Sequence, residues 1–127
     1  MKKLSFSALM ISAISLAPSV LHATAPVATQ VSVNTYTGYV SQAVALTSDS
    51  NLVTGYVSFS GYYNGTYTFA FEISPDGSHW CQAQETATVV NPTANGVSWS
   101  TNCRTKYVRI RCVNGPSTCS NNAWIVQ

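Results

Sequence analysis

Hydrophobic and polar residues alternate in short runs along most of the chain beyond residue 29. In the clearest run, Thr66–Ile73, the side chains of Tyr67, Phe69, Phe71 and Ile73 share one face of an extended segment. This alternation predicts a half-buried β-strand. Beyond the first part of the chain no segment places apolar residues at helical spacing over three turns, so we expect no helix there.

Other runs of the same kind predict further strands, and Asn-Gly pairs at 64–65, 95–96 and 114–115 are among the turn signals between them. About eight short strands at this spacing are typical of an all-β, antiparallel sandwich or jelly roll. Alternation also predicts that Val108 and Ile110 join the apolar face of the first strand in the core. The predicted strands are Gln30–Val33, Tyr39–Leu46, Leu52–Ser60, Thr66–Ile73, His79–Ala83, Thr86–Val90, Val97–Thr101, Lys106–Val113 and Ala123–Val126.

The beginning of the chain has the features of a signal peptide. Lys2 and Lys3 precede an uncharged, largely apolar stretch over residues 4–21, and small residues follow it. We expect cleavage after Ala23 or after Ala25. The remainder is predicted to comprise a short tether over residues 24–29 and one β-sandwich domain over residues 30–127.

This signal peptide predicts a secreted protein, located in the periplasm or outside a bacterial-type cell. Serines and Pro18 interrupt the apolar stretch, which is therefore a poor permanent membrane span. No later segment is apolar enough to cross a bilayer, so we expect no transmembrane segment in the mature protein.

Removal of the signal peptide leaves a domain without net charge. The chain has six Lys and Arg and four Asp and Glu, and the loss of two lysines leaves four bases against four acids. Binding to a nucleic-acid backbone needs a basic surplus, so we expect no nucleic-acid partner. We also expect no cofactor and no metal, because the mature chain has one histidine, His79, and no C-x-x-C pair.

All four cysteines lie in the second half of the chain, and an even number in a small exported domain indicates disulfides. Four cysteines allow three pairings. The segment from Cys112 to Cys119 contains Asn-Gly-Pro at 114–116, and we interpret it as a short turn closed by its own bridge. Cys81 is then left to pair with Cys103, so the predicted fold is disulfide-stapled.

Two stretches resemble one family of binding domains. Residues 71–80, FEISPDGSHW, resemble the strand, S-x-D-G-x-x-W turn and strand of discoidin-like (coagulation factor 5/8 type C) domains and related hairpins in jelly rolls of phage virion proteins. Residues 106–111, KYVRIR, resemble the R-Y-V-R-I strand of the same group. The resemblance covers roughly residues 66–113 and implies a galactose-binding-like jelly roll that binds glycans, lipid head groups or other surfaces through loops. It carries over no ligand residue, and the matches to its structural motif are Asp76, Gly77, Trp80 and Arg109.

The first candidate ligand site is aromatic. Tyr62 and Tyr63 lie beside the turn at Asn64, and exposed rings with nearby amides form platforms for sugar rings. The alternative for aromatic residues is burial, and we expect Trp80, Trp99 and Trp124 in the core of the sandwich. The candidate ligand-binding residues at this turn are Tyr62, Tyr63 and Asn64.

The second candidate site is basic. Alternation along residues 107–112 leaves Tyr107, Arg109 and Arg111 on the outer face of one strand. Two guanidinium groups beside a ring can hold a carboxylate, a sulfate or a phosphate. The alternative is a solvated face whose arginines pair with acids on the next strand.

Catalytic patterns are weak in this sequence. His79 lies three residues after Asp76, but an aspartate in such a turn usually caps nearby backbone, and no G-x-S-x-G elbow is present. Glu72 and Glu85 can face each other across a hairpin as paired carboxylates, but with four acids in the mature chain we attribute this placement to coincidence. We therefore expect no enzyme, with a small secreted hydrolase or enzyme inhibitor as a lesser alternative.

The predicted function is a secreted, non-catalytic binding or adhesion module for glycans or another cell-surface ligand. The alternative is a structural subunit of an extracellular filament, matrix or other assembly, because the surface is poor in charge and the terminal strand Ala123–Val126 can pair with another copy. Self-association belongs to this alternative, whereas we expect the terminal strand to complete its own sheet.

Overall fold

The computed structural model describes residues 25–47 and 52–127. Every regular element in this part of the chain is a strand, so it contains no helix long and apolar enough to cross a membrane. The predicted signal peptide lies outside the described residues. The strands are β1 (Ala28–Tyr36), β2 (Val44–Ala45), β3 (Leu52–Ser58), β4 (Thr66–Ser74), β5 (Cys81–Val90), β6 (Gly96–Asn102), β7 (Tyr107–Asn114) and β8 (Pro116–Val126).

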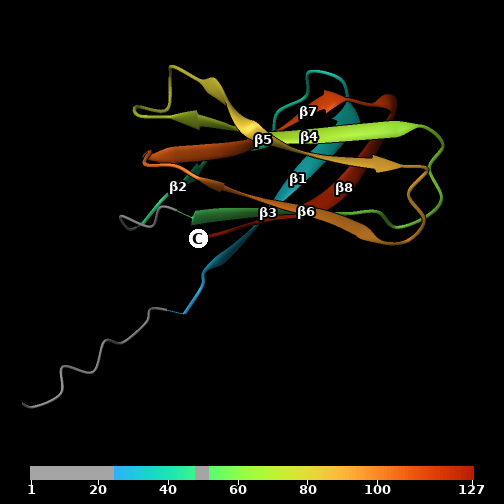
Figure 1. Cartoon of the computed structure of the whole chain (residues 1–127), viewed down its shortest axis with the longest axis horizontal. Coiled ribbons are helices and arrows are strands. Elements are labelled where there is room, and N and C mark those ends of the chain that lie inside the picture. Colours follow the sequence, from blue (N-terminus) through green and yellow to red (C-terminus); the bar gives the residue numbers. More distant parts are fainter. Residues whose placement is uncertain (1–24, 48–51) are drawn as a thin grey trace, which may run out of the picture.

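The strands form an antiparallel β-sandwich of two four-stranded sheets. Sheet A has the strand order β1-β8-β3-β6, and sheet B has the order β2-β7-β4-β5. In Figure 1, β4, β5 and β7 lie in the upper layer, and β3 and β6 lie in the lower layer. Successive strands belong to different sheets throughout, except for β4 and β5, which are neighbours in sheet B. The sandwich predicted from the strand spacing is therefore confirmed.

The core between the sheets is built from the faces that alternation predicted. Tyr67, Phe69 and Phe71 of β4 are fully buried. Val108 and Ile110 of β7 are fully buried as well, whereas Ile73 is partly buried and packs against the same cluster. The predicted register of β4 and β7 is thus correct, since a slip of one residue would have turned these rings to solvent.

Trp99 of β6 joins this core and requires a glycine opposite it. Its ring lies 4.9 Å from the Phe71 ring and 6.2 Å from the Phe69 ring, measured between centroids. Its cross-strand partner is Gly55 of β3. A Cβ at Gly55 would lie 2.8 Å from both Phe71 Cζ and Trp99 Cζ2, so only glycine leaves room for the indole. Burial of Trp99 is therefore confirmed.

Several predicted strands differ from the structure. The two strands expected at residues 79–83 and 86–90 are one strand, β5, which begins at Cys81. Strand β1 begins at Ala28, inside the predicted tether. Residues 39–46 do not form one strand: only β2 and an isolated bridge between Val40 and Arg111 pair with β7. Ser41 interrupts the ladder, because its Oγ accepts the Ile110 N–H at 2.9 Å in place of a carbonyl. The last strand is longer than predicted, since β8 already begins at Pro116.

The predicted disulfide staples are not present in the structure, in which all four cysteines are free thiols. The Cys112–Cys119 bridge was expected from a short turn at residues 114–116. The chain instead crosses there from β7 in sheet B to β8 in sheet A, so the two cysteines belong to facing sheets. Cys81 is exposed at the start of β5, and Cys103 is partly buried after β6.

The chain segments that enter and leave the sandwich lie side by side. The Val27 N–H donates to the Gln127 carbonyl at 2.9 Å, and the Gln127 N–H donates to the Val27 carbonyl at 3.0 Å. These bonds continue the pairing of β1 with β8, in which Ala28 lies opposite Val126. The last strand lies between β1 and β3, so the expectation that it completes its own sheet is confirmed.

Candidate functional site

The predicted basic group lies on the outer face of sheet B, and Glu72 of the neighbouring strand β4 lies between its two arginines. Arg109 donates from Nε to Glu72 Oε2 at 2.6 Å, and Arg111 donates from Nη1 to Glu72 Oε1 at 2.6 Å. The Glu72 side chain is only 6% exposed. Burial alone would raise its pKa, but the hydrogen bonds and charges of Arg111 and Arg109 outweigh burial and hold the pKa of Glu72 below its usual value. This arrangement matches the alternative of a face paired with an acid.

Trp80 covers the same cluster from outside. The guanidinium carbon of Arg109 lies 4.1 Å from the centroid of the Trp80 ring, which is a cation–π contact. Trp80 is only partly buried and belongs to the outer face of sheet B, so the expectation of a core position is wrong. Because a ring and a carboxylate both engage Arg109, Arg111 is the more open cation, with 40% of its side chain exposed against 23%.

Tyr107 and Asp76 both contact the turn between β4 and β5. A Cβ at Gly77, whose φ is +79°, would lie 3.6 Å from the Tyr107 ring, which places that ring beneath the turn. Asp76 Oδ1 accepts the N–H groups of Ser78 and His79 at 2.8 and 2.9 Å. These bonds to nearby backbone are the capping role expected of an aspartate in such a turn.

The structure does not bring together the side chains of either weak catalytic pattern. His79 Nδ1 lies 2.6 Å from Asp76 Oδ2, but Ser74 donates its hydroxyl to the same Asp76 rather than to the imidazole. Glu72 is directed at the arginines of β7, whereas Glu85 accepts a hydrogen bond from Thr101 of β6. The two glutamates therefore have separate partners and do not form a carboxylate pair.

The two tyrosines of the predicted platform lie in different environments. Tyr62 is 68% exposed. Tyr63 packs edge-on against Phe59, with 5.4 Å between ring centroids, and its hydroxyl lies 3.2 Å from Ser60 Oγ. Asn64 is exposed, and its carbonyl accepts the Tyr67 hydroxyl at 3.3 Å. Tyr62 and Tyr63 thus do not present one flat surface.

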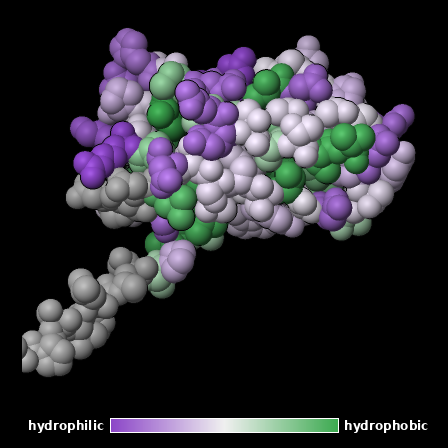
Figure 2. Space-filling view, viewed as in Figure 1, coloured by the Kyte–Doolittle hydropathy of each residue, from purple (hydrophilic) through white to green (hydrophobic). Residues whose placement is uncertain are grey.

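The outer face of sheet A is a candidate site that the sequence analysis missed. None of its four strands, β1, β3, β6 and β8, contains Asp, Glu, Lys, Arg or His. Figure 2, which shows the sandwich from the side with both layers in view, has pale areas of intermediate hydropathy between its purple and green patches. Residues that point outward from sheet A include Gln30, Ser32, Ser58, Ser98, Ser100 and Asn122.

Two aromatic rings lie in the middle of this uncharged face. Tyr56 of β3 and Trp124 of β8 are direct cross-strand partners, and their ring centroids are 5.6 Å apart at an interplanar angle of 49°. Tyr56 is 38% exposed, and Trp124 is partly buried, so its expected core position is wrong. A Cβ at Gly96 of β6 would overlap the Tyr56 ring, and the glycine therefore lets that ring lie across β6.

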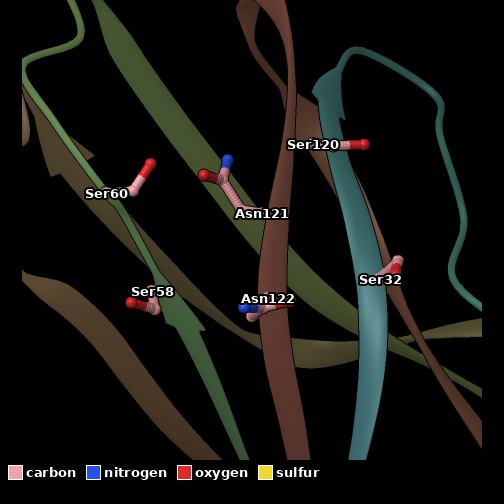
Figure 3. A pocket seen from close by; sticks show the side chains of 6 residues that line it. All are labelled: Ser32, Ser58, Ser60, Ser120, Asn121 and Asn122. Atoms are coloured by element: carbon pink, nitrogen blue, oxygen red, sulfur yellow. The ribbon is translucent and has the colours of Figure 1, made fainter.

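A polar pocket of about 130 Å³ adjoins this ring pair (Figure 3). It contains Ser58 and Asn122, which lie two residues along β3 and β8 from Tyr56 and Trp124. The Asn121 side chain also lines the pocket, although Asn121 is only 5% exposed. Its Oδ1 lies 3.5 Å from the Tyr63 hydroxyl, so one of the predicted tyrosines does contact this site.

No protein-family model matches the chain, and comparisons with curated proteins and with solved structures find no match either. The resemblance to discoidin-like domains therefore stays a prediction. Within residues 25–47 and 52–127, no three His, Cys, Asp or Glu side chains gather closely enough to hold a metal ion.

Proposed function

We propose that the protein is a secreted, non-catalytic binding module for neutral glycans and that the outer face of sheet A is its binding surface. The observation that carries the proposal is a sheet without a charged residue, centred on the Tyr56–Trp124 ring pair. A sugar ring has C–H faces that stack on aromatic rings and hydroxyl groups that exchange hydrogen bonds with Ser and Asn side chains. A neutral ligand that covered a charged side chain would remove it from water at a cost in free energy, and these strands contain no charged residue.

An acidic ligand at Arg109 and Arg111 is the weaker candidate. Glu72 already occupies both guanidinium groups, and a ligand carboxylate or sulfate would have to displace it from bonds of 2.6 Å. Displacement would leave the Glu72 carboxylate, which is 6% exposed, without its partners. The sheet A face requires no such exchange.

We further infer that the sandwich is a jelly roll. A sheet of order 1-8-3-6 facing a sheet of order 2-7-4-5 is the arrangement produced by two nested Greek keys in an eight-stranded jelly roll. This inference agrees with the fold that the discoidin-like resemblance implies. The proposed binding surface differs from that resemblance, because it is a sheet face and not a group of loops.

Export and oxidation belong to the same proposal. In an oxidising compartment we expect the bridges Cys112–Cys119 and Cys81–Cys103 to form. Support for the first bridge comes from the contacts of Thr35 and Gly115. A Cβ at Gly115 would lie 3.0 Å from Cys112 Sγ and would overlap the Thr35 carbonyl. The Oγ1 atom of the same Thr35 accepts the Cys119 N–H. Burial raises the pKa of the Cys112 thiol to about 11, so thiolate is scarce in the folded domain and the bridge should form during folding.

An array of neutral and sulfated oligosaccharides tests the function directly. Wild-type protein should bind neutral oligosaccharides, and raising the salt concentration should change that binding little because no ion pair is involved. Tyr56→Ala and Trp124→Ala should abolish binding. Tyr62→Ala is the matched control, since it removes an exposed ring elsewhere. A protein that binds only sulfated sugars, or that binds neutral sugars equally well without both rings, would contradict the proposal.

A structural subunit is the second candidate, and one observation favours it. Strand β6 is one of the two edge strands of sheet A and, like the other, β1, carries no charged residue, whereas exposed edge strands are usually protected against pairing by charges. A subunit that assembles through this edge should increase in mass with concentration in analytical ultracentrifugation. Ser100→Lys on β6 should then prevent assembly, while a glycan-binding monomer would keep one mass at every concentration.

A further inference from the structure

The polar pocket beside the ring pair exists because two strands of sheet A diverge. The pairing between β3 and β8 ends at Val57 and Ala123. Beyond that point β8 continues along β1, with Ser32 opposite Asn122, and the chain after β3 turns away. In Figure 3 the side chains of Ser60 and Asn121 both reach into the space between β8 and the segment that follows β3.

Asn121 brings an unused hydrogen-bond donor to this pocket. Its Nδ2 is buried and has no hydrogen-bond partner among the described residues. Nearly all buried polar groups in proteins are hydrogen-bonded, so a buried amide that lines a pocket without a protein partner calls for a water or a ligand atom there. The Tyr63 hydroxyl, 3.5 Å from Oδ1, holds the other side of the amide. Tyr63 is thus a positioning residue for Asn121.

The lining of the pocket limits the chemistry of its ligand. All six lining residues are Ser or Asn, and none is charged or apolar. The amide Nδ2 can only donate, whereas serine hydroxyls both donate and accept. A hydroxyl group satisfies both kinds of partner, because its oxygen accepts from the amide and its hydrogen goes to a serine. An anion would find no cation here, and an apolar group would leave the amide unpaired.

We propose that this pocket is a subsite of the glycan surface, which takes a hydroxyl or hydroxymethyl group of the sugar residue next to the one stacked on Tyr56 and Trp124. The proposal rests on the proposed function. Two residues along a strand span about 7 Å, a length comparable with one sugar residue. Neighbouring sugars can therefore occupy the ring pair and the pocket at the same time, with Asn121 fixing the position of the glycan along the face.

Titration calorimetry with cellohexaose, maltohexaose and mannohexaose tests the subsite on the full mature protein. Asn121→Asp keeps the shape of the side chain and removes the donor, so affinity for the hexasaccharide that the wild type binds should fall about tenfold, the worth of one hydrogen bond. Tyr63→Phe frees the amide and should cause a smaller loss. Gln84→Glu is the matched control, because it makes the same amide-to-carboxylate change at an exposed side chain of β5 in sheet B, away from the proposed surface, and it should bind as the wild type does.

A second readout needs no substitution. In ¹⁵N-labelled wild-type protein, the side-chain amide signals of Asn121 should shift on saturation with the bound hexasaccharide, and those of Gln84 on sheet B should not. If Asn121→Asp binds normally and the Asn121 signals stay in place while Tyr56→Ala abolishes binding, the subsite is wrong and the glycan surface stands. If the wild type binds none of the three sugars, both proposals fall. Should Asn121→Asp not fold, the wild-type titration decides alone.

Discussion

Replacement of Glu72 by glutamine removes the charge that Arg109 and Arg111 share, and we expect the domain to lose about 2 kcal/mol of stability. Breaking a buried ion pair by removing one partner costs about 3–5 kcal/mol. The two arginine side chains are 23% and 40% exposed, so water screens them and the cost must be discounted. Glutamine also keeps one acceptor oxygen in place, which reduces the loss further.

Urea unfolding at neutral pH measures this effect. Glu85→Gln is the control, because that exposed carboxylate accepts a hydrogen bond from Thr101 without an arginine, and its removal should change stability much less. If Glu72→Gln lost under about 0.5 kcal/mol, the arginines would not depend on Glu72, and the argument against an acidic ligand at this site would fail. Binding of sulfated sugars that appears only in Glu72→Gln would support the argument.

Acid gives a second check on the same residue. The pKa of Glu72 is lower in the folded protein than its usual value of 4.5, so its ionised form stabilises the fold above the unfolded pKa. That contribution is lost as the pH falls through the folded pKa. The stability difference between wild type and Glu72→Gln should therefore be constant near neutral pH and shrink below about pH 4.5. A difference that grows in acid would mean that the sign of the shift is wrong.

Three further predictions follow from other parts of the structure. Phe69→Ala should cost about 3–5 kcal/mol in urea unfolding, because the ring is fully buried, and a cost under about 1 kcal/mol would place it outside the core. Gly96→Val should displace the Tyr56 ring and weaken neutral-glycan binding at least about tenfold, with the far-UV circular dichroism spectrum unchanged; normal binding would argue against the ring pair. Non-reducing peptide mapping of protein secreted by an expression host should recover a peptide with Cys112 joined to Cys119, and four free thiols would refute the bridges.

The strands that local sequence predicts are those with one strictly buried face. In β4 and β7 every second residue packs into the core, so the period of two is visible without knowledge of the neighbours. In β8 the local signal misleads, because Asn-Gly-Pro reads as a stop. The chain passes close to the Thr35 backbone at Gly115, where a Cβ would overlap the Thr35 carbonyl, and a new strand, β8, begins directly at Pro116.

The candidate site was harder to predict than the strands because it depends on pairing between distant segments. Alternation with Val53 and Val57 already turns Tyr56 outward, and alternation with Ala123 and Ile125 does the same for Trp124. Their contact requires β8 to lie beside β3 in one particular register, which no local pattern encodes. The orphaned amide of Asn121 is likewise visible only once the divergence of these strands is known.

The pairing of Val27 with Gln127 determines how the domain would respond to a pulling force. A pull on the chain before Val27 and after Gln127 acts at one end of the β1–β8 ladder. It would open the hydrogen bonds one after another, starting with the two between Val27 and Gln127 and continuing to the pair at Ala28 and Val126. A domain tethered through both ends would therefore be a mechanically weak link. The same closeness would allow insertion of the domain into a surface loop of another protein without separating the ends of that loop.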